Sequence, residues 1–196
     1  LICYLGGKQL DAMAEISSLQ VGLYRANAQI ESFDTAFFSM KSSSCPHLFF
    51  ATSHVAHDNL DPIIEVMGET GHIKWTQASY TIQRGDGTME TVAMSSPDVV
   101  RDNIINAVLK RIESPDSFVF TPDRARVLTE LVDAAHASAP IIQVPEDQVS
   151  IVPGEIAGDE RCVWNGLDAI IRRTFDEIRL PIQSDFAFCK NGAQTN

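Results

Sequence analysis

The sequence lacks the glycine-rich loops that bind nucleotide phosphates. Neither G-x-G-x-x-G nor G-x-x-x-x-G-K-[ST] occurs among its 196 residues, and these patterns bring backbone N–H groups close to phosphate in Rossmann and P-loop domains. The G-x-S-x-G turn that exposes the nucleophile of many hydrolases is missing too. The sequence therefore excludes a complete dinucleotide or triphosphate cradle of these types, and it gives no serine-hydrolase signature.

Cysteine is scarce and follows no pattern. The four cysteines, Cys3, Cys45, Cys162 and Cys189, include no C-x-x-C pair and no regular spacing. A zinc ribbon or a secreted disulfide scaffold would need such pairs. We therefore expect free, mostly packed thiols in a reducing compartment, and a cytoplasmic protein.

Basic residues and long apolar runs are also few. The sequence has 15 Lys and Arg against 26 Asp and Glu, a formal net charge of −11, with no basic stripe. Phosphate backbones and anionic membranes attract Lys and Arg, so neither nucleic acid nor a membrane surface is an expected partner. No apolar run approaches the roughly 20 residues of a membrane-spanning helix.

The first seven residues resemble the end of a helix. The run Leu1–Gly7 has no basic region before its apolar residues, so it does not have the pattern of a signal peptide. Gly6 and Gly7 are typical helix terminators. We expect the natural chain to begin upstream of Leu1.

From about residue 15 to residue 94, the hydrophobic pattern has a period near two. Alternating runs occur around residues 19–24 and 33–38, and residues 48–56 are rich in aromatic and β-branched side chains. Such runs between Asn, Ser, Pro and Gly clusters predict strands of a half-buried sheet. Gly85-Asp86-Gly87 predicts a hairpin between residues 80–84 and 88–93.

After residue 95 the period changes to 3.6 and predicts three helices. Ser96-Pro97-Asp98 and Thr121-Pro122-Asp123 each combine a cap, a first-turn proline and an acidic residue. The first helix has Val100, Ile104, Val108 and Ile112 on one face, and the second directs Leu128, Leu131, Val132 and Ala135 inward. The third spans about residues 163–178.

This order of elements predicts an α+β fold, with helices packed on one face of a mostly antiparallel open sheet. We expect one domain over residues 1–180 and a loosely structured tail over residues 181–196. Within that tail, Phe186 and Phe188 are the residues that we expect to dock.

Polar residues near two predicted strand ends are candidates for ligand binding. Tyr24, Arg25 and Asn27 can bind hydroxyl-rich ligands by directed hydrogen bonds. An ion pair between Arg25 and Asp34 is the alternative that we favour. His54 either faces a cleft or is a hydrogen-bonded sheet histidine. His54 and His57 are three positions apart and would face opposite sides of a strand, so we predict no metal site.

Several stretches together resemble the C-terminal domain of the glucose–fructose oxidoreductase/inositol dehydrogenase/MocA (Gfo/Idh/MocA) family. The stretches are residues 23–27 with 30–35, residues 52–56, residues 68–75, and residues 124–141. The resemblance covers most of residues 1–180.

The resemblance implies a two-part NAD(P)-dependent sugar or polyol dehydrogenase. The glycine loop, the catalytic lysine, and the Asp and His that complete the site would all precede Leu1, so we expect this chain alone to bind no cofactor and to be inactive. The implied substrate-side surface consists of Tyr24, Arg25, Asn27, Ser53 and His54. The implied partners are a sugar or polyol and further copies of the chain, which would associate through the sheet face.

Two alternatives stay open. The chain is a non-catalytic binding or scaffold protein that never had a Rossmann partner, or it belongs to an NAD-dependent glycosidase of the same fold, in which oxidation is transient.

Overall fold

The computed structural model describes residues 1–9, 12–156 and 158–186, and the chain in it forms two compact units. Unit 1 combines Leu1–Asp58 with the chain from Phe120 onward, and unit 2 is Asn59–Val119. The union of both units in one domain over residues 1–180 stays a prediction.

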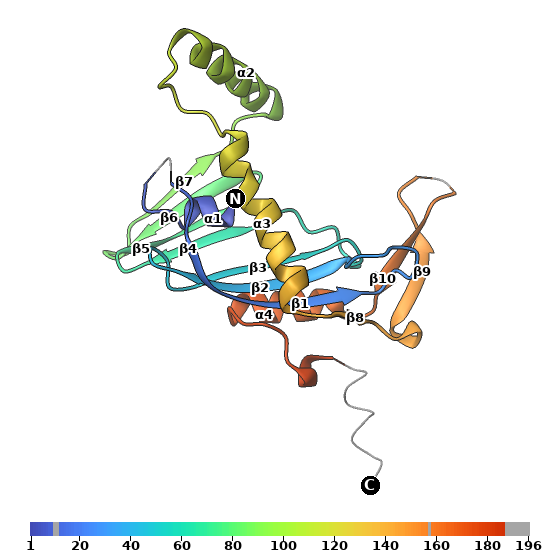
Figure 1. Ribbon diagram of the computed structural model, residues 1–196. Helices are drawn as coiled ribbons and strands as arrows, with labels where there is room; N and C mark the ends of the chain where they lie inside the picture. The colour runs from blue at the N-terminus through green and yellow to red at the C-terminus, as the bar shows by residue number, and fades with distance from the viewer. Residues whose placement is uncertain (10–11, 157, 187–196) are drawn as a thin grey trace. The chain divides into compact units, whose positions relative to one another are not determined.

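Unit 1 is built on a four-stranded sheet with the strand order β3-β2-β1-β8 (Figure 1). The strands are β1 (Ile16–Arg25), β2 (Thr35–Ser42), β3 (Leu48–Ser53) and β8 (Ile141–Gln143). β2 pairs antiparallel with β1 and with β3, whereas β8 pairs parallel with β1. Consequently β1, β3 and β8 all run in one direction, and their last residues lie at the same edge of the sheet.

Successive side chains of a strand point to opposite faces of the sheet. Buried apolar residues occur on both faces of this one. One face carries the buried residues Ala14, Leu23, Ala36, Phe38, Met40 and Leu48, together with Ala135 of α3 (Pro122–Ser138). The other carries Tyr24, Ala26, Phe37, Val55 and Val144, together with Trp164, Phe186, and Leu167 and Ile170 of α4 (Leu167–Asp176). Figure 1 shows α3 and α4 on opposite sides of the sheet.

The α+β fold with mostly antiparallel sheets is confirmed, but the helices of unit 1 cover both faces of its sheet and not one. The physical reason lies in β2, where consecutive Phe37 and Phe38 are 0% and 4% exposed. Each face therefore needs its own cover. Within α3, Ala135 is buried as predicted, whereas Leu128 is 68% exposed and does not point inward.

A two-stranded hairpin precedes α4, and its last two residues lie where the sequence pattern predicted the start of the third helix. It consists of β9 (Val149–Pro153) and β10 (Glu160–Trp164). Val163 and Trp164 therefore end a strand and do not begin the third helix. Gly166 has a φ of 83°, a left-handed conformation that glycine adopts readily, and it turns the chain from β10 into α4.

The remaining elements of unit 1 are short. α1 (Ile2–Leu5) ends at Gly6, whose N–H bonds to the carbonyl of Ile2, as the sequence predicts. A 3₁₀ turn, η1 (Glu146–Gln148), precedes β9, and another, η2 (Gln183–Asp185), follows α4. Phe186 is docked as predicted, at 5% exposed, while Phe188 and Cys189 lie outside the described residues.

Unit 2 is an antiparallel meander followed by one helix. Its elements are β4 (Ile64–Gly68), β5 (Gly71–Trp75), β6 (Ser79–Arg84), β7 (Met89–Ala93) and α2 (Pro97–Glu113). The predicted hairpin at Gly85-Asp86-Gly87 is confirmed, with Gly87 at a φ of 86°. The predicted cap of α2 is confirmed as well, since the Ser96 hydroxyl accepts a hydrogen bond from Val99 N.

The sheet of unit 2 has one apolar and one polar face. The registers place Ile64, Val66, Ile73, Trp75, Tyr80, Ile82 and Val92 on the apolar face. Residues 59–119 are all described and none of them is buried. The apolar residues of α2 are exposed too, with Ile104 at 60% and Ile112 at 75%. Unit 2 therefore has no closed core of its own.

No helix within the described residues is both long and apolar enough to cross a membrane.

Candidate functional site

The five candidate residues come together at one edge of the unit 1 sheet. Arg25, Ser53 and Gln143 are the last residues of β1, β3 and β8, and Thr35 begins β2 between them. Tyr24 pairs with Thr35, and Thr35 pairs with Ser53. We call residues 24–27 and 53–54 the carboxyl edge.

Tyr24 is the buried member of the carboxyl edge. Its ring is 5% exposed and lies against Trp164, Phe186 and Phe37, with centroid distances of 5.4, 5.1 and 6.0 Å. Edge-to-face and tilted contacts at these distances stabilise aromatic clusters. Tyr24 is therefore a packing residue in the aromatic cluster that supports the carboxyl edge.

Arg25 binds groups other than the favoured carboxylate partner. Its Nε donates to Gln143 Oε1 at 2.8 Å, and Nη1 donates to the carbonyls of Ile30 and Glu31. Gln143 returns a bond from Nε2 to the Arg25 carbonyl at 2.9 Å. Among the described residues Arg25 makes no ion pair with Asp34, so that alternative is wrong. The reason is that backbone N–H groups and a hydroxyl take the oxygens of Asp34.

Asp34 is the hub of the carboxyl edge, and it is 4% exposed. Its Oδ2 accepts from the N–H groups of Ala26 and Asn27, both at 2.8 Å, and its Oδ1 accepts from the Thr35 hydroxyl at 3.0 Å. These three hydrogen-bond donors offset the free energy that it costs to bury a carboxylate away from water. Sequence reasoning placed Asp34 only as a partner of Arg25. It missed the bonds to the N–H groups of Ala26 and Asn27, which lie eight and seven positions earlier in the chain.

Ser53 is the last residue of β3, and His54 follows it. The Ser53 hydroxyl lies 2.8 Å from the Thr35 hydroxyl and accepts from Val55 N at 3.0 Å. His54 N donates to the Asp34 carbonyl at 2.9 Å, and the His54 side chain is exposed. Asn27, half-buried, accepts from Gln29 N through its side-chain oxygen. The carboxyl edge thus offers guanidinium and amide groups at the end of β1, and hydroxyl and imidazole groups at the end of β3.

His57 belongs to a charged cluster beside the carboxyl edge. Its Nδ1 lies 3.2 Å from Asp58 Oδ1, and Arg172 of α4 donates to Asp58 Oδ2 at 2.8 Å. The hydrogen bond from His57, together with the nearby Arg172, lowers the pKa of Asp58. Asp168 accepts from the N–H groups of both His57 and Asp58. No group of three or more His, Cys, Asp and Glu side chains within the described residues is arranged to hold a metal ion.

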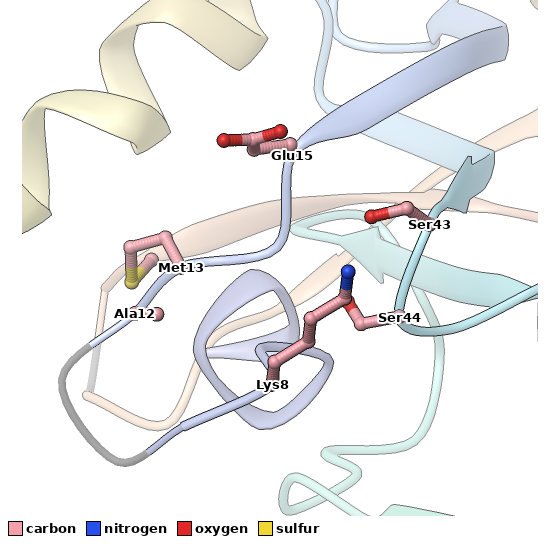
Figure 2. Close-up of a pocket in the computed structure, with 6 residues that line it drawn as sticks. All are labelled: Lys8, Ala12, Met13, Glu15, Ser43 and Ser44. Atoms are coloured by element: carbon pink, nitrogen blue, oxygen red, sulfur yellow. The ribbon is translucent and has the colours of Figure 1, made fainter.

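A small pocket lies at the opposite edge of the same sheet, near the start of β1 and the turn from β2 to β3 (Figure 2). Its lining residues are Lys8, Ala12, Met13, Glu15, Ser43 and Ser44. Figure 2 shows the Lys8 side chain running toward Ser44, with Glu15 across from it. The volume is about 130 Å³, below the roughly 300–1,000 Å³ typical of small-molecule sites. The pocket therefore has room for a small ion or waters rather than for a sugar.

Unit 2 has an open groove of about 420 Å³ beside the β4–β5 and β6–β7 turns. Its lining residues are Met67, Gly68, Gly71, His72, Gln83, Arg84, Gly85 and Gly87. Arg84 lies 2.8 Å from Glu90, and His72 Nε2 lies 3.4 Å from Glu65 without a hydrogen-bond partner among the described residues. Nothing in this balance of charge favours one class of ligand.

The N-termini of the three long helices among the described residues are poorly suited to bind a pyrophosphate. Pyrophosphate binds at helix N-termini, where backbone N–H groups and the helix dipole attract it. The three long helices each have an aspartate in the first turn, namely Asp98, Asp123 and Asp168. These carboxylates repel phosphate, and Asp168 already binds two N–H groups. We therefore assign no residue of this chain to NAD(P).

Comparison of the sequence with models of known families gives no match, and comparison with curated proteins gives none either. The fold does have matches among solved structures. One is an oxidoreductase from Agrobacterium radiobacter in complex with NAD⁺, L-tartaric acid and magnesium. Its TM-score is 0.52 and its identity 17%, over 63% of this chain and 41% of that structure.

A second match is the UDP-N-acetylglucosamine 3-dehydrogenase GnnA from Acidithiobacillus ferrooxidans. Its TM-score is 0.53 and its identity 15%, over 64% of this chain and 40% of that structure. This chain therefore spans about two fifths of the length of either structure. At these identities the likeness shows the fold alone: this chain shares its α+β fold with part of these two solved enzyme structures.

Proposed function

We propose that this chain is the substrate-binding and oligomerisation domain of a cytoplasmic NAD(P)-dependent oxidoreductase that acts on a sugar or polyol. The nucleotide-binding domain would lie outside these 196 residues. When bound there, the nicotinamide supplies the hydride transfer. The residues of this chain bind and orient the substrate, and the chain alone is inactive.

The observation that carries this proposal is the gathering of Arg25, Asn27, Ser53 and His54 at one edge of the sheet. A hydroxyl-rich ligand needs several directed donors and acceptors that are held by rigid elements. Strand ends meet that need, because their backbones are fixed by ladder hydrogen bonds. The L-tartaric acid bound in one similar structure, and the UDP-N-acetylglucosamine in the enzyme name of the other, support a hydroxyl-bearing substrate for this chain as well.

A titration followed by NMR tests the proposal. The ¹⁵N-labelled chain is titrated with myo-inositol, D-glucose and UDP-N-acetylglucosamine, and the amide shifts are mapped. We expect the largest changes at residues 25–27 and 53–54 for at least one of these compounds. Changes confined to the small pocket at Lys8 and Ser44, or to unit 2, would contradict the assignment of the carboxyl edge.

Self-association is the second part of the proposal. The apolar face of the unit 2 sheet is exposed, with Val66 at 42% and Ile73 at 39%. Contiguous apolar patches of this kind are typical of protein interfaces. A symmetric homo-oligomer would bury the same face of each copy.

A further inference from the structure

Asp34 connects the separate strands of the carboxyl edge through five hydrogen bonds. The carboxylate holds the N–H groups of Ala26 and Asn27, which follow β1, and the hydroxyl of Thr35 in β2. The backbone of the same residue donates to the Tyr24 carbonyl at 3.0 Å and accepts from His54 N at 2.9 Å. One residue thus fixes the end of β1, the start of β2 and the end of β3.

Asp34 fixes the candidate residues through backbone groups and Thr35, and it does not bond directly to their side chains. Its partners are backbone groups and the Thr35 hydroxyl, so it takes no donor from the side chains of Arg25, Asn27 or His54. Through Thr35 it also reaches Ser53, whose hydroxyl accepts from Val55 N. A residue that fixes the backbone of several functional residues, without bonding directly to their side chains, has the geometry of a positioning group.

We propose that Asp34 is a positioning residue for substrate binding, acting through the backbone of residues 26–27 and 54 and through the Thr35–Ser53 hydroxyl pair. This inference rests on the proposed function, because it takes the carboxyl edge as the substrate side. It makes the affinity for substrate depend on a buried group that never contacts the ligand.

Three variants separate positioning from mere stability. Asp34→Ala removes the whole carboxylate. Asp34→Asn retains an oxygen that can turn toward the two backbone N–H groups, while its NH₂ faces the Thr35 oxygen, which can accept. Thr35→Val removes only the hydroxyl that links Asp34 to Ser53, and it serves if Asp34→Ala does not fold.

The matched control is Thr174→Val in α4. Thr35 and Thr174 are both 0% exposed, and the Thr174 hydroxyl donates to the carbonyls of Ile170 and Ile171 within its own helix. The control therefore loses a buried hydroxyl at a comparable cost in stability, but it leaves the bonds of the carboxyl edge intact.

The experiment measures amide hydrogen exchange and the Kd for myo-inositol, D-glucose and UDP-N-acetylglucosamine on the same samples. In Asp34→Ala we expect exchange at Ala26 and Asn27 to rise about tenfold or more relative to core amides, as loss of a hydrogen bond to a charged group implies. We expect a similar rise in Kd for Asp34→Ala, a clear rise for Thr35→Val, and near-wild-type values for Asp34→Asn and Thr174→Val.

The outcomes distinguish this inference from the proposed function. Wild-type affinity in both Asp34→Ala and Thr35→Val, or a loss no greater than in Thr174→Val, would overturn the positioning role and leave the proposed function standing. If the wild-type chain binds none of the three compounds, the proposed function fails. The amide hydrogen exchange of Asp34→Ala is then the only readout. A rise in exchange confined to Ala26 and Asn27 supports Asp34 as the group that fixes the carboxyl edge, and a uniform rise overturns that role.

Discussion

Asp185 and Phe186 fix the end of the described chain by two different physical means. The Asp185 side chain is 3% exposed and accepts from Arg179, Arg173 and Ile182 N. Phe186 stacks on Trp164 with a centroid distance of 5.7 Å and an interplanar angle of 15°. An ionic anchor and an apolar anchor respond to different perturbations, so each can be tested by itself.

The ionic anchor makes stability depend on pH in the acid range. The hydrogen bond from Arg179 is the main cause that holds the pKa of Asp185 well below its usual value. A depressed pKa stabilises the fold above the unfolded value of about 3.9, and this stabilisation is lost as the pH falls from there toward the folded pKa. Urea unfolding between pH 5 and pH 2 should show this loss in the wild type.

Asp185→Asn should lower stability at pH 5 and flatten the acid dependence, while Asp133→Asn, at an exposed position of α3, should keep the wild-type slope. Equal slopes for wild type and Asp185→Asn would show that the anchor does not stabilise the fold.

The apolar anchor predicts a large loss on truncation. Phe186→Ala empties a site bounded by Tyr24 and Trp164, and such changes typically cost about 3–5 kcal/mol of unfolding free energy. Phe50 in β3 is 42% exposed and provides the control, since Phe50→Ala should cost well under half as much. Denaturant midpoints measured with Trp fluorescence would decide, and equal midpoints for the two variants would contradict the docking of Phe186.

At the residue scale, the sequence predicted which side chains share an edge but not how they bond. Tyr24, Arg25, Asn27, Ser53 and His54 follow from strand ends and from the family resemblance. The actual partners of Arg25 include Gln143, which is 118 positions away, and only the parallel pairing of β1 with β8 brings them together. Local patterns carry no information on that pairing, so a nearby carboxylate was the natural but wrong partner.

At the scale of elements, local chemistry predicted most strands, the hairpin and two helix starts. Ser96 caps α2, and Gly87 takes the left-handed conformation that its turn needs. The third helix was placed too early because Val163 and Trp164 fit a helical stripe as well as a buried strand. Pairing with β9 decided in favour of the strand.

The β5–β6 pair gives a prediction for one element. A Cβ at Gly71 would lie 2.5 Å from the Gln83 carbonyl oxygen, whereas one at Gly68 would meet nothing closer than 3.7 Å. Gly71→Ala should therefore push β5 away from β6 and destabilise unit 2. Overpacking in protein cores typically costs about 1–3 kcal/mol of unfolding free energy, and we expect a loss of that size here. Gly68→Ala should be near neutral.

Amide exchange in β5 and β6 is the direct measurement for both glycine variants. Protection lost in Gly71→Ala but kept in Gly68→Ala is the expected result, and equal protection would show that the strands adjust without cost.

At the scale of the whole molecule, the exposed apolar face of unit 2 predicts self-association. Ile73→Lys places a charge on that face and should shift sedimentation toward smaller species. Met67 is 61% exposed and lies on the opposite face, so Met67→Lys is the matched control and should sediment like the wild type. A wild-type chain that remains a monodisperse monomer at high concentration would refute association through this face.

The central claim is that these residues are the substrate side of a larger NAD(P)-dependent enzyme, and the intact mass and N-terminal sequence of the native protein test it most directly. The account predicts a further stretch on the order of 120–150 residues before Leu1, enough for a nucleotide-binding domain, with a glycine-rich loop within it. A native chain that begins at or near Leu1 would contradict the account, and the non-catalytic binding protein would then be the better explanation of this fold.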